Sequence, residues 1–328
     1  MTANPAPCNP PFIRPVLIAA GPTASGKSAL ALEIAQKYNG VIINADAMQC
    51  YRELRILTAR PSDHDLALAP HTLYGSFSAF EPPNAASWRE QALIEIETAL
   101  LNDQIPILCG GSGMYLHALI NGIAPIPAPD PVARETARAL LLQHGPAMLH
   151  KILAENDPKT ALKLRPSDGQ RIARAHEIWL STGRPLSEWQ EIPGTPAPYR
   201  FAAICLDPPR EQLRAAIGHR FTGMIAEGAV REVQALLALN FPEATPILRA
   251  HGVPELKAYL SSNISLAQAC ADAVKVTSQY TKRQATWFRH HALATAPLNL
   301  RLIARFNAAE QFSENITAFL DSFFTSNP

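Results

Sequence analysis

The chain lacks a charge excess, paired cysteines and a long apolar run, and each absence excludes a class of protein. Its formal net charge is +1 and charged residues make up 17% of its 328 residues, so a nucleic-acid surface could only be a local patch. The five cysteines form no Cys-x-x-Cys pair, which argues against a zinc site and suits reduced thiols in a cytoplasm. No apolar run reaches the length of a membrane span, so we expect no membrane association.

The clearest feature that is present is a glycine-rich loop between an apolar strand, residues 16–20, and an amphipathic helix that follows it. The loop reads Gly21, Pro22, Thr23, Ala24, Ser25, Gly26, Lys27, Ser28 and fits Gly-x-x-x-x-Gly-Lys-Ser/Thr. Its backbone N–H groups and the helix N-terminus suit an anion, Lys27 suits phosphates and Ser28 suits magnesium. The motif predicts a polyphosphate site without saying whether the ligand is a nucleotide, and the alternative is a chance glycine turn.

Two further apolar strands end in polar groups. Residues 40–46 end in Asp46, and residues 105–109 lead into a glycine-rich turn with Ser112. The carboxyl ends of parallel strands border the ligand crevice of an open α/β sheet, so both side chains should lie near the loop. Asp46 is a candidate catalytic or metal-linked acid, or else a cap of the next helix.

Proline-rich segments at residues 121–131 and 192–198 bound a stretch that reads as helices only. An apolar strand at 201–207 then resumes the first pattern. We expect an α/β fold with a parallel sheet flanked by helices, a P-loop NTPase-like core, and an all-helical insertion domain. The expected parts are core residues 1–124, the helical insertion 125–198, and core residues 199–328 with C-terminal helices. Beyond Leu298 we expect a last helix at 308–324 and no chemical group.

Two local patches carry basic side chains. Gln170, Arg171 and Arg174 share one helical face of the insertion, and residues 272–291 interleave basic groups with aromatics. Both could bind RNA, or could be a solvated face and a partly buried helix. Arg220, on a helix with an apolar opposite side, could be exposed or could reach a phosphate.

Several segments in this order resemble the tRNA dimethylallyltransferase family, over about residues 16–291: GPTASGKS, NAD followed by AMQCYR, TARP, GGSGMYLHAL, DPVAR, QRIARAHEIWLSTGRPLSEWQ, IGHRFTGMIAEGAVREV and TKRQATWFRH. The resemblance implies transfer of a dimethylallyl group from dimethylallyl diphosphate to N6 of the adenosine just 3′ of a tRNA anticodon, with release of diphosphate. It implies Asp46 as general base, Thr23 on the oxygen that links the allyl carbon to diphosphate, and Arg220 with Lys27 and Ser28 on the leaving group. It also implies Mg²⁺ between Ser28 and the diphosphate.

The resemblance further implies contacts with the anticodon stem-loop of tRNA. The positions that correspond to these contacts are Asp46, Ala47, Met48, Gln49, Ser112, Arg134, Gln170, Arg171, Arg174, Arg249, Gly252, Lys282, Arg283, Gln284, Trp287 and Arg289. The chain departs from the family pattern at Ala47, at Ser112 and at Val253-Pro254. The expected enzyme is a cytoplasmic monomer.

Three other readings share parts of this pattern. A small-molecule or nucleotide kinase would bind ATP on the same loop and use Asp46 to orient a hydroxyl, but would leave the helical insertion unused. An RNA-binding module with a relict loop would not need Asp46 and Lys27. An enzyme that prenylates free AMP would not need a large insertion that grips tRNA.

Overall fold

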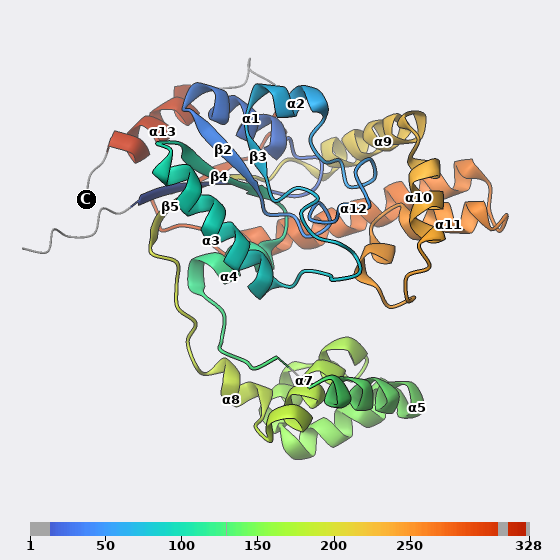
Figure 1. Cartoon of the computed structure of the whole chain (residues 1–328). Helices are drawn as coiled ribbons and strands as arrows, with labels where there is room; N and C mark the ends of the chain where they lie inside the picture. The colour runs from blue at the N-terminus through green and yellow to red at the C-terminus, as the bar shows by residue number, and fades with distance from the viewer. Residues whose placement is uncertain (1–13, 129, 308–313, 326–328) are drawn as a thin grey trace, which may run out of the picture. The chain divides into compact units, whose positions relative to one another are not determined.

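The computed structural model describes residues 14–128, 130–307 and 314–325 and is drawn in Figure 1. The chain divides into two compact units, one formed by Met1–Ile120 with Ala197–Pro328 and one by Asn121–Pro196. We call them the core unit and the insertion unit. The insertion unit interrupts the core unit in sequence, between a helix and the strand that continues the sheet.

A six-stranded sheet runs through the core unit in the order β3-β2-β4-β1-β5-β6, and every strand pair is parallel. The strands are β1 (Arg14–Ala20), β2 (Gly40–Asn44), β3 (His71–Thr72), β4 (Ile105–Gly110), β5 (Tyr199–Leu206) and β6 (Asn299–Leu302). Leu17 of β1 pairs with Ile107 on one side and with Ala202 on the other. Because β1 is central and covered on both faces, its run Val-Leu-Ile-Ala-Ala is fully buried and continuously apolar.

Alternate residues of β1 serve two different cores. Val16 and Ile18 pack with side chains of α3 (Ala85–Leu101) and α4 (Gly113–Asn121), including Trp88. Leu17 packs with α1 (Lys27–Lys37) and α13 (Glu314–Thr325) on the opposite face. The sheet is therefore sandwiched between helical layers, as Figure 1 shows. The first residues of the expected last helix, 308–313, lie outside the described residues.

A third core joins the remaining helices of the core unit, which are α9 (Arg210–Glu227), α10 (Ala229–Ala238), η1 (Pro246–Arg249), α11 (Val253–Leu260) and α12 (Leu266–His290). Phe221, Leu256 and Ala273 are buried in it. A short helix, α2 (Asp63–Leu68), lies before β3. The long α12 reaches from this helical group back to the sheet, because its far end buries Phe288 in the core beneath α3 and α4.

The insertion unit consists of α5 (Pro131–Asn156), α6 (Pro158–Lys163), α7 (Gly169–Thr182) and α8 (Leu186–Gln190). Its own core contains Leu149, Leu153 and Ile172. The helix α5 is interrupted at Gly145, whose φ of 73° leaves the helical region. This break divides α5 into two helical segments on either side of residue 145.

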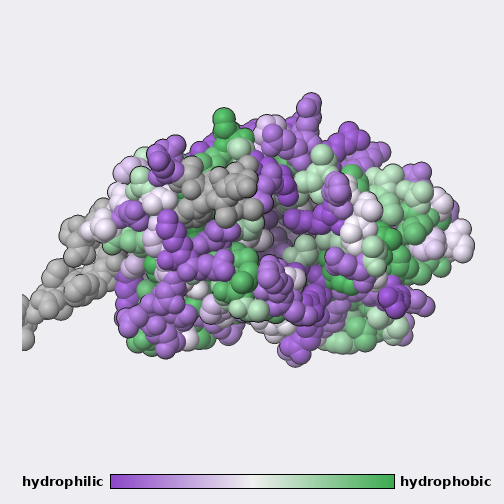
Figure 2. Space-filling view, turned by 90° about the horizontal axis from the view of Figure 1, so that it is seen from above, coloured by the Kyte–Doolittle hydropathy of each residue, from purple (hydrophilic) through white to green (hydrophobic). Residues whose placement is uncertain are grey.

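In Figure 2 hydrophilic side chains cover much of the face seen from above, with hydrophobic side chains gathered toward the right-hand end. None of the helices within the described ranges has the length and apolar character that a membrane span needs. Cys50, Cys109, Cys205 and Cys270 are free thiols, and Cys8 lies outside the described residues.

Candidate active site

The glycine-rich loop lies at the carboxyl end of β1 and leads directly into α1. Gly26 has a φ of 95°, and a Cβ there would lie 2.0 Å from the carbonyl oxygen of Phe306, so both the backbone angle and the space demand glycine. Lys27 is the first residue of α1, and its Nζ donates to the carbonyl oxygen of Pro22 at 3.4 Å. The loop thus folds back toward the side chain of Lys27, and the N-terminus of α1 directly follows the loop.

Three charged side chains from different elements meet beside this loop. Burial lowers the pKa of Lys27, Asp46 raises it, and Arg220 lowers it. Arg220, from α9, is exposed and lines a cavity beside the loop. The surrounding protein nevertheless desolvates its guanidinium and so lowers its pKa; Arg305 lowers this pKa further, and Asp46 raises it. Arginine remains cationic at neutral pH. Asp46 therefore lies within electrostatic reach of two cations, Lys27 and Arg220.

Asp46 follows β2 and is held by a local hydrogen-bond network. Its Oδ1 accepts from the backbone N–H of Met48 at 3.0 Å, and its own N–H donates to Asn44 at 2.9 Å. The next backbone N–H, of Ala47, donates to Ser112 Oγ at 2.8 Å. Residues 47–50 form a turn, so the alternative that Asp46 caps a helix is wrong. These contacts leave the second carboxylate oxygen of Asp46 without a partner among the described protein groups.

Two cavities meet at Asp46. The loop cavity, of about 1040 Å³, is lined by Gly26, Lys27 and Ser28 among others. The inner cavity, of about 340 Å³, has an apolar wall that includes Leu57, Phe221 and Met224. Thr23, Asp46 and Arg220 line both cavities. A polyphosphate on the loop and a second group in the inner cavity would therefore meet at the same three side chains.

The helix α12 fastens the loop to the sheet. Gln284 is buried, its Oε1 accepts from the backbone N–H of Thr23 at 2.9 Å, and its Nε2 donates to the carbonyl oxygen of Gly111 at 3.0 Å. A single side chain therefore joins the turns that follow β1 and β4. Its expected contact with tRNA stays a prediction, but in this structure both ends of the amide are already used within the protein.

The other expected contacts on α12 face different directions. Arg289 donates two hydrogen bonds, of 2.8 and 2.9 Å, to the carboxylate of Asp207 after β5. Trp287 packs against Gly113, where a Cβ would lie 2.3 Å from the indole ring. Lys282 and Arg283 are exposed, and Arg283 lines the inner cavity. The sequence pattern placed these residues on one RNA-binding helix, whereas the fold divides them between structural contacts and an open surface.

Other expected contact residues lie around the inner cavity. Its lining includes Ala47, Met48, Ser112 and Arg249. Gln49 lines the loop cavity, and its amide donates to the carbonyl oxygens of Thr58 and Ala59 at 2.8 and 2.9 Å. Gly252, with a φ of 97°, precedes α11, and its N–H donates to Glu255. All of these positions except Gly252 therefore line one of the two cavities.

In the insertion unit, the expected arginines pair with acids of the same unit. Arg134 Nε lies 2.9 Å and Arg174 Nη1 lies 3.3 Å from Oε1 of Glu177. Arg171 lies 3.6 Å from Asp168, and Gln170 is exposed. The arginines remain partly or largely exposed in spite of this pairing, so they are accessible to a phosphate.

Sequence reasoning missed Arg305 and Phe306. The segment after β6 crosses the glycine-rich loop: Arg305 Nε donates to the carbonyl oxygen of Ala24 at 2.9 Å, and Phe306 N donates to that of Ser25 at 3.0 Å. Arg305 also lines the loop cavity. The expectation that nothing chemical follows Leu298 is therefore wrong. The signal was the segment Asn299–Leu302, since a parallel strand there brings the following residues to the same sheet edge as Asp46.

The core unit is thus a parallel α/β sheet of the P-loop type, with a glycine-rich loop, an adjacent acid and a second cavity. Two family models match the chain, IPP transferase over residues 49–291 and Isopentenyl transferase over residues 15–74. A tRNA dimethylallyltransferase of Acidiphilium cryptum is 54% identical over 98% of this chain and 98% of its own, and one of Granulibacter bethesdensis is 50% identical over 94% and 97%. The crystal structure of the tRNA isopentenylpyrophosphate transferase of Bacillus halodurans matches with a TM-score of 0.66 at 27% identity, over 95% of this chain and 98% of the other. The chain belongs to the IPP transferase family and is a prenyltransferase enzyme.

Proposed function

We propose that this protein transfers the dimethylallyl group of dimethylallyl diphosphate to N6 of the adenosine just 3′ of the anticodon in tRNA and releases diphosphate. The observation that carries the proposal is the position of Thr23, Asp46 and Arg220 in the wall that the loop cavity and the inner cavity share. Diphosphate in the first cavity and adenine in the second would place the allyl carbon between them. The names of the relatives support the same activity.

The proposed reaction forms the bond from N6 to the allyl carbon and breaks the bond from that carbon to the diphosphate oxygen. Asp46 accepts the proton that N6 loses, using the carboxylate oxygen that no backbone N–H occupies. The departing diphosphate takes the electron pair of the broken bond. Thr23 donates to the oxygen that leaves, and Lys27 and Arg220 offset its growing negative charge.

The donor set beside the loop fits magnesium. Ser28 brings a hydroxyl oxygen to the loop cavity, and the described residues hold no cluster of His, Cys, Asp or Glu that would cage a metal by itself. Mg²⁺ is commonly bound by one or two protein oxygens together with substrate phosphates. Burial raises the pKa of Cys109, so this nearby thiol stays protonated and offers no thiolate to a softer metal. We propose that Ser28 holds Mg²⁺, which would neutralise part of the diphosphate charge.

The inner cavity suits an unstacked adenine and the prenyl chain. Leu57, Phe221 and Met224 give it an apolar wall, while Ser112 and Arg249 are polar groups at its lining. The target base has to leave its stack, because N6 cannot otherwise reach the allyl carbon. We propose that the residues around this cavity and those of the insertion unit contact the anticodon stem-loop of tRNA. We further propose that the enzyme acts in the cytoplasm as a monomer.

Arg171 and Arg174 test the contribution of the insertion unit. Replacing both by Ala should weaken tRNA binding and reduce the slope of log Kd against log salt concentration by about 0.7–0.9 for each phosphate that the variant no longer neutralises. The measurement is a titration of labelled tRNA at several salt concentrations. Lys159→Ala, which removes an exposed cation paired with Glu191 in the same unit, is the matched control and should leave the slope unchanged. An unchanged slope in the arginine variant would mean that these side chains only form a solvated face.

Arg305 tests the segment that crosses the loop. Arg305→Met removes a charged donor from the loop cavity, so KM for dimethylallyl diphosphate should rise roughly tenfold, equivalent to about 1.5 kcal/mol for a hydrogen bond to a charged group. KM for tRNA should not change. Steady-state kinetics with each substrate varied in turn separates the two. Equal losses for both substrates, together with a lower Tm, would show that Arg305 only fastens the loop through Ala24.

The proposed function itself is tested by the fate of a labelled prenyl group. The protein is incubated with Mg²⁺, radioactive dimethylallyl diphosphate and unmodified tRNA that has an adenosine 3′ of the anticodon. Parallel reactions replace tRNA by AMP, and the prenyl donor by labelled ATP. Label in tRNA alone is the expected result. Label in AMP would overturn the assignment of tRNA as the acceptor. Transfer of phosphate from ATP would overturn the assignment of dimethylallyl diphosphate as the donor.

A further inference from the structure

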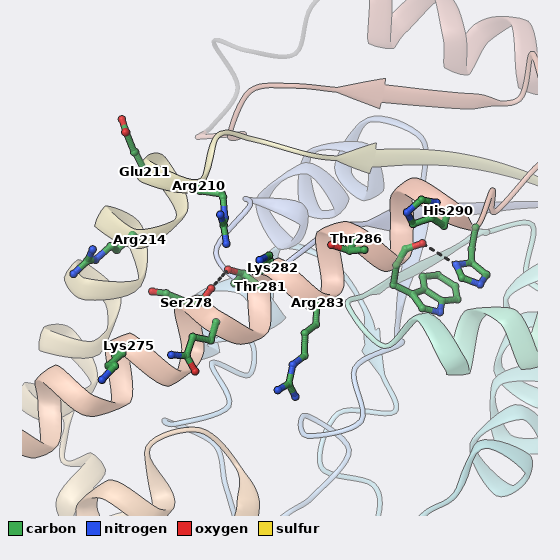
Figure 3. A pocket seen from close by; sticks show the side chains of 13 residues that line it. Arg210, Glu211, Arg214, Lys275, Ser278, Thr281, Lys282, Arg283, Thr286 and His290 are labelled. Carbon is green, nitrogen blue, oxygen red and sulfur yellow. Dashed lines mark hydrogen bonds between the residues drawn. The ribbon is translucent and has the colours of Figure 1, made fainter. Parts of the chain in front are cut away.

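A second large depression of the core unit lies outside the two cavities of the active site. It is an open groove of about 1310 Å³ between α9 and α12, shown in Figure 3, and we call it the α9–α12 groove. Arg210 and Arg214 of α9 line it together with Lys275, Lys282 and Arg283 of α12. Glu211 is the only acid among its described lining residues, and Figure 3 shows it directed away from α12. The groove therefore carries a local excess of positive charge, although the formal net charge of the whole chain is only +1.

The cations of the groove are not neutralised by acids in the described part of the chain. None of these five side chains forms an ion pair with a carboxylate in the described part of the chain, although Arg289 on the same helix does. Arg210 is moreover the first residue of α9, where the helix dipole disfavours a cation. Figure 3 shows Arg210 directed from α9 toward the turn of α12 that carries Lys282. Exposed cations without a carboxylate partner are available to an external anion.

The shape of the groove favours an extended polyanion. The sequence spacings place Lys275, Lys282 and Thr286 on one side of α12, and the lining of the groove continues along the helix to His290. From Lys275 to His290 the helix rises about 22 Å at about 1.5 Å per residue, which is long for a single phosphate group. Arg283 lines both this groove and the inner cavity. A chain of phosphates in the groove would therefore lead toward the site that holds the target base.

We propose that the α9–α12 groove binds the phosphate backbone of the substrate tRNA next to the nucleotide whose base enters the inner cavity, with Arg210, Arg214 and Lys275 as phosphate ligands. The inference rests on the proposed function, because that function supplies the RNA. It extends the RNA-binding surface to α9, which contributed no residue to the tRNA contacts implied by the sequence. The contacts are to phosphate, so they increase affinity without selecting a base sequence.

The test uses the full chain with Arg210→Ala and Arg214→Ala combined. Removing two phosphate ligands should reduce the slope of log Kd against log salt concentration by about 1.4–1.8 and weaken tRNA binding by about tenfold or more at moderate salt. The effect should appear in KM for tRNA rather than in kcat, and KM for dimethylallyl diphosphate should not change. Adding Lys275→Ala should reduce the slope again. The combined Arg210→Lys and Arg214→Lys variant should keep most of the slope, since Lys also binds phosphate as a point charge.

Arg231→Ala is the matched control, because Arg231 is an exposed arginine on α10 that lines none of the cavities described here. It should bind tRNA as the unaltered chain does. The groove proposal alone would be overturned by two results together. The unaltered chain would transfer the prenyl group to tRNA, and the Arg210 and Arg214 variant would bind tRNA with unchanged affinity and salt slope. Absence of transfer by the unaltered chain would instead overturn the proposed function. A groove that serves a free polyphosphate or a protein partner would give the first of these results.

Discussion

Asp46→Asn should lower kcat for prenyl transfer on the order of 10²–10⁴-fold, the usual contribution of a positioned general base. The amide oxygen of Asn can still accept the hydrogen bond from the Met48 backbone, so the turn after β2 should keep its shape. The amide cannot take the proton that N6 loses. The measurement is a single-turnover rate with saturating tRNA and dimethylallyl diphosphate, because it separates chemistry from product release.

The binding of both substrates distinguishes this role from a structural one. Removing the Asp46 charge leaves Lys27 and Arg220 without their nearby carboxylate, so affinity for diphosphate should stay the same or increase. Affinity for tRNA should be largely retained. Asp63→Asn, at an exposed position on α2, is the matched control and should be fully active. A variant that loses tRNA binding in proportion to its rate would contradict the assignment of Asp46 as the base.

Lys27→Met should lower kcat/KM for dimethylallyl diphosphate by about 10²–10³-fold, the usual effect of removing one group that stabilises a developing anion. Lys27 is buried at the start of α1, and methionine has a similar length and no charge to bury. The helix and loop should therefore remain folded. The measurement is steady-state kinetics with the diphosphate varied at saturating tRNA, accompanied by Tm.

The matched control for this variant is Lys37→Met, in the last turn of the same helix and on the surface. It removes the same charge about 15 Å along the helix axis, at about 1.5 Å per residue. Its kcat/KM should equal that of the unaltered chain. If Lys27→Met kept full activity, the loop would not hold the diphosphate through its lysine, and the assignment of the loop cavity to the leaving group would fail.

The sequence by itself determined the parts of the site that depend on neighbouring residues. The loop from Gly21 to Ser28 is a local motif, because its glycines and the helix N-terminus that follows are neighbours in sequence and can be recognised together. The position of Asp46 beside it followed from the rule that parallel strands end at one edge of the sheet. The sequence also indicated the helical insertion, because proline-rich segments at residues 121–131 and 192–198 bound a stretch that reads as helices only.

Only the tertiary structure decided which side chains of a helix meet distant partners. The pattern of α12 showed basic and aromatic residues, but not that Gln284 would be buried against Thr23 and Gly111 or that Arg289 would pair with Asp207. Arg305 reached the loop because the short edge strand β6 pairs with β5, and this pairing places the residues that follow β6 beside the loop. The α9–α12 groove likewise joins cations that lie more than 60 residues apart in sequence. Local patterns record the conformation of a segment, whereas these contacts depend on packing between segments and become visible only when the chain is folded.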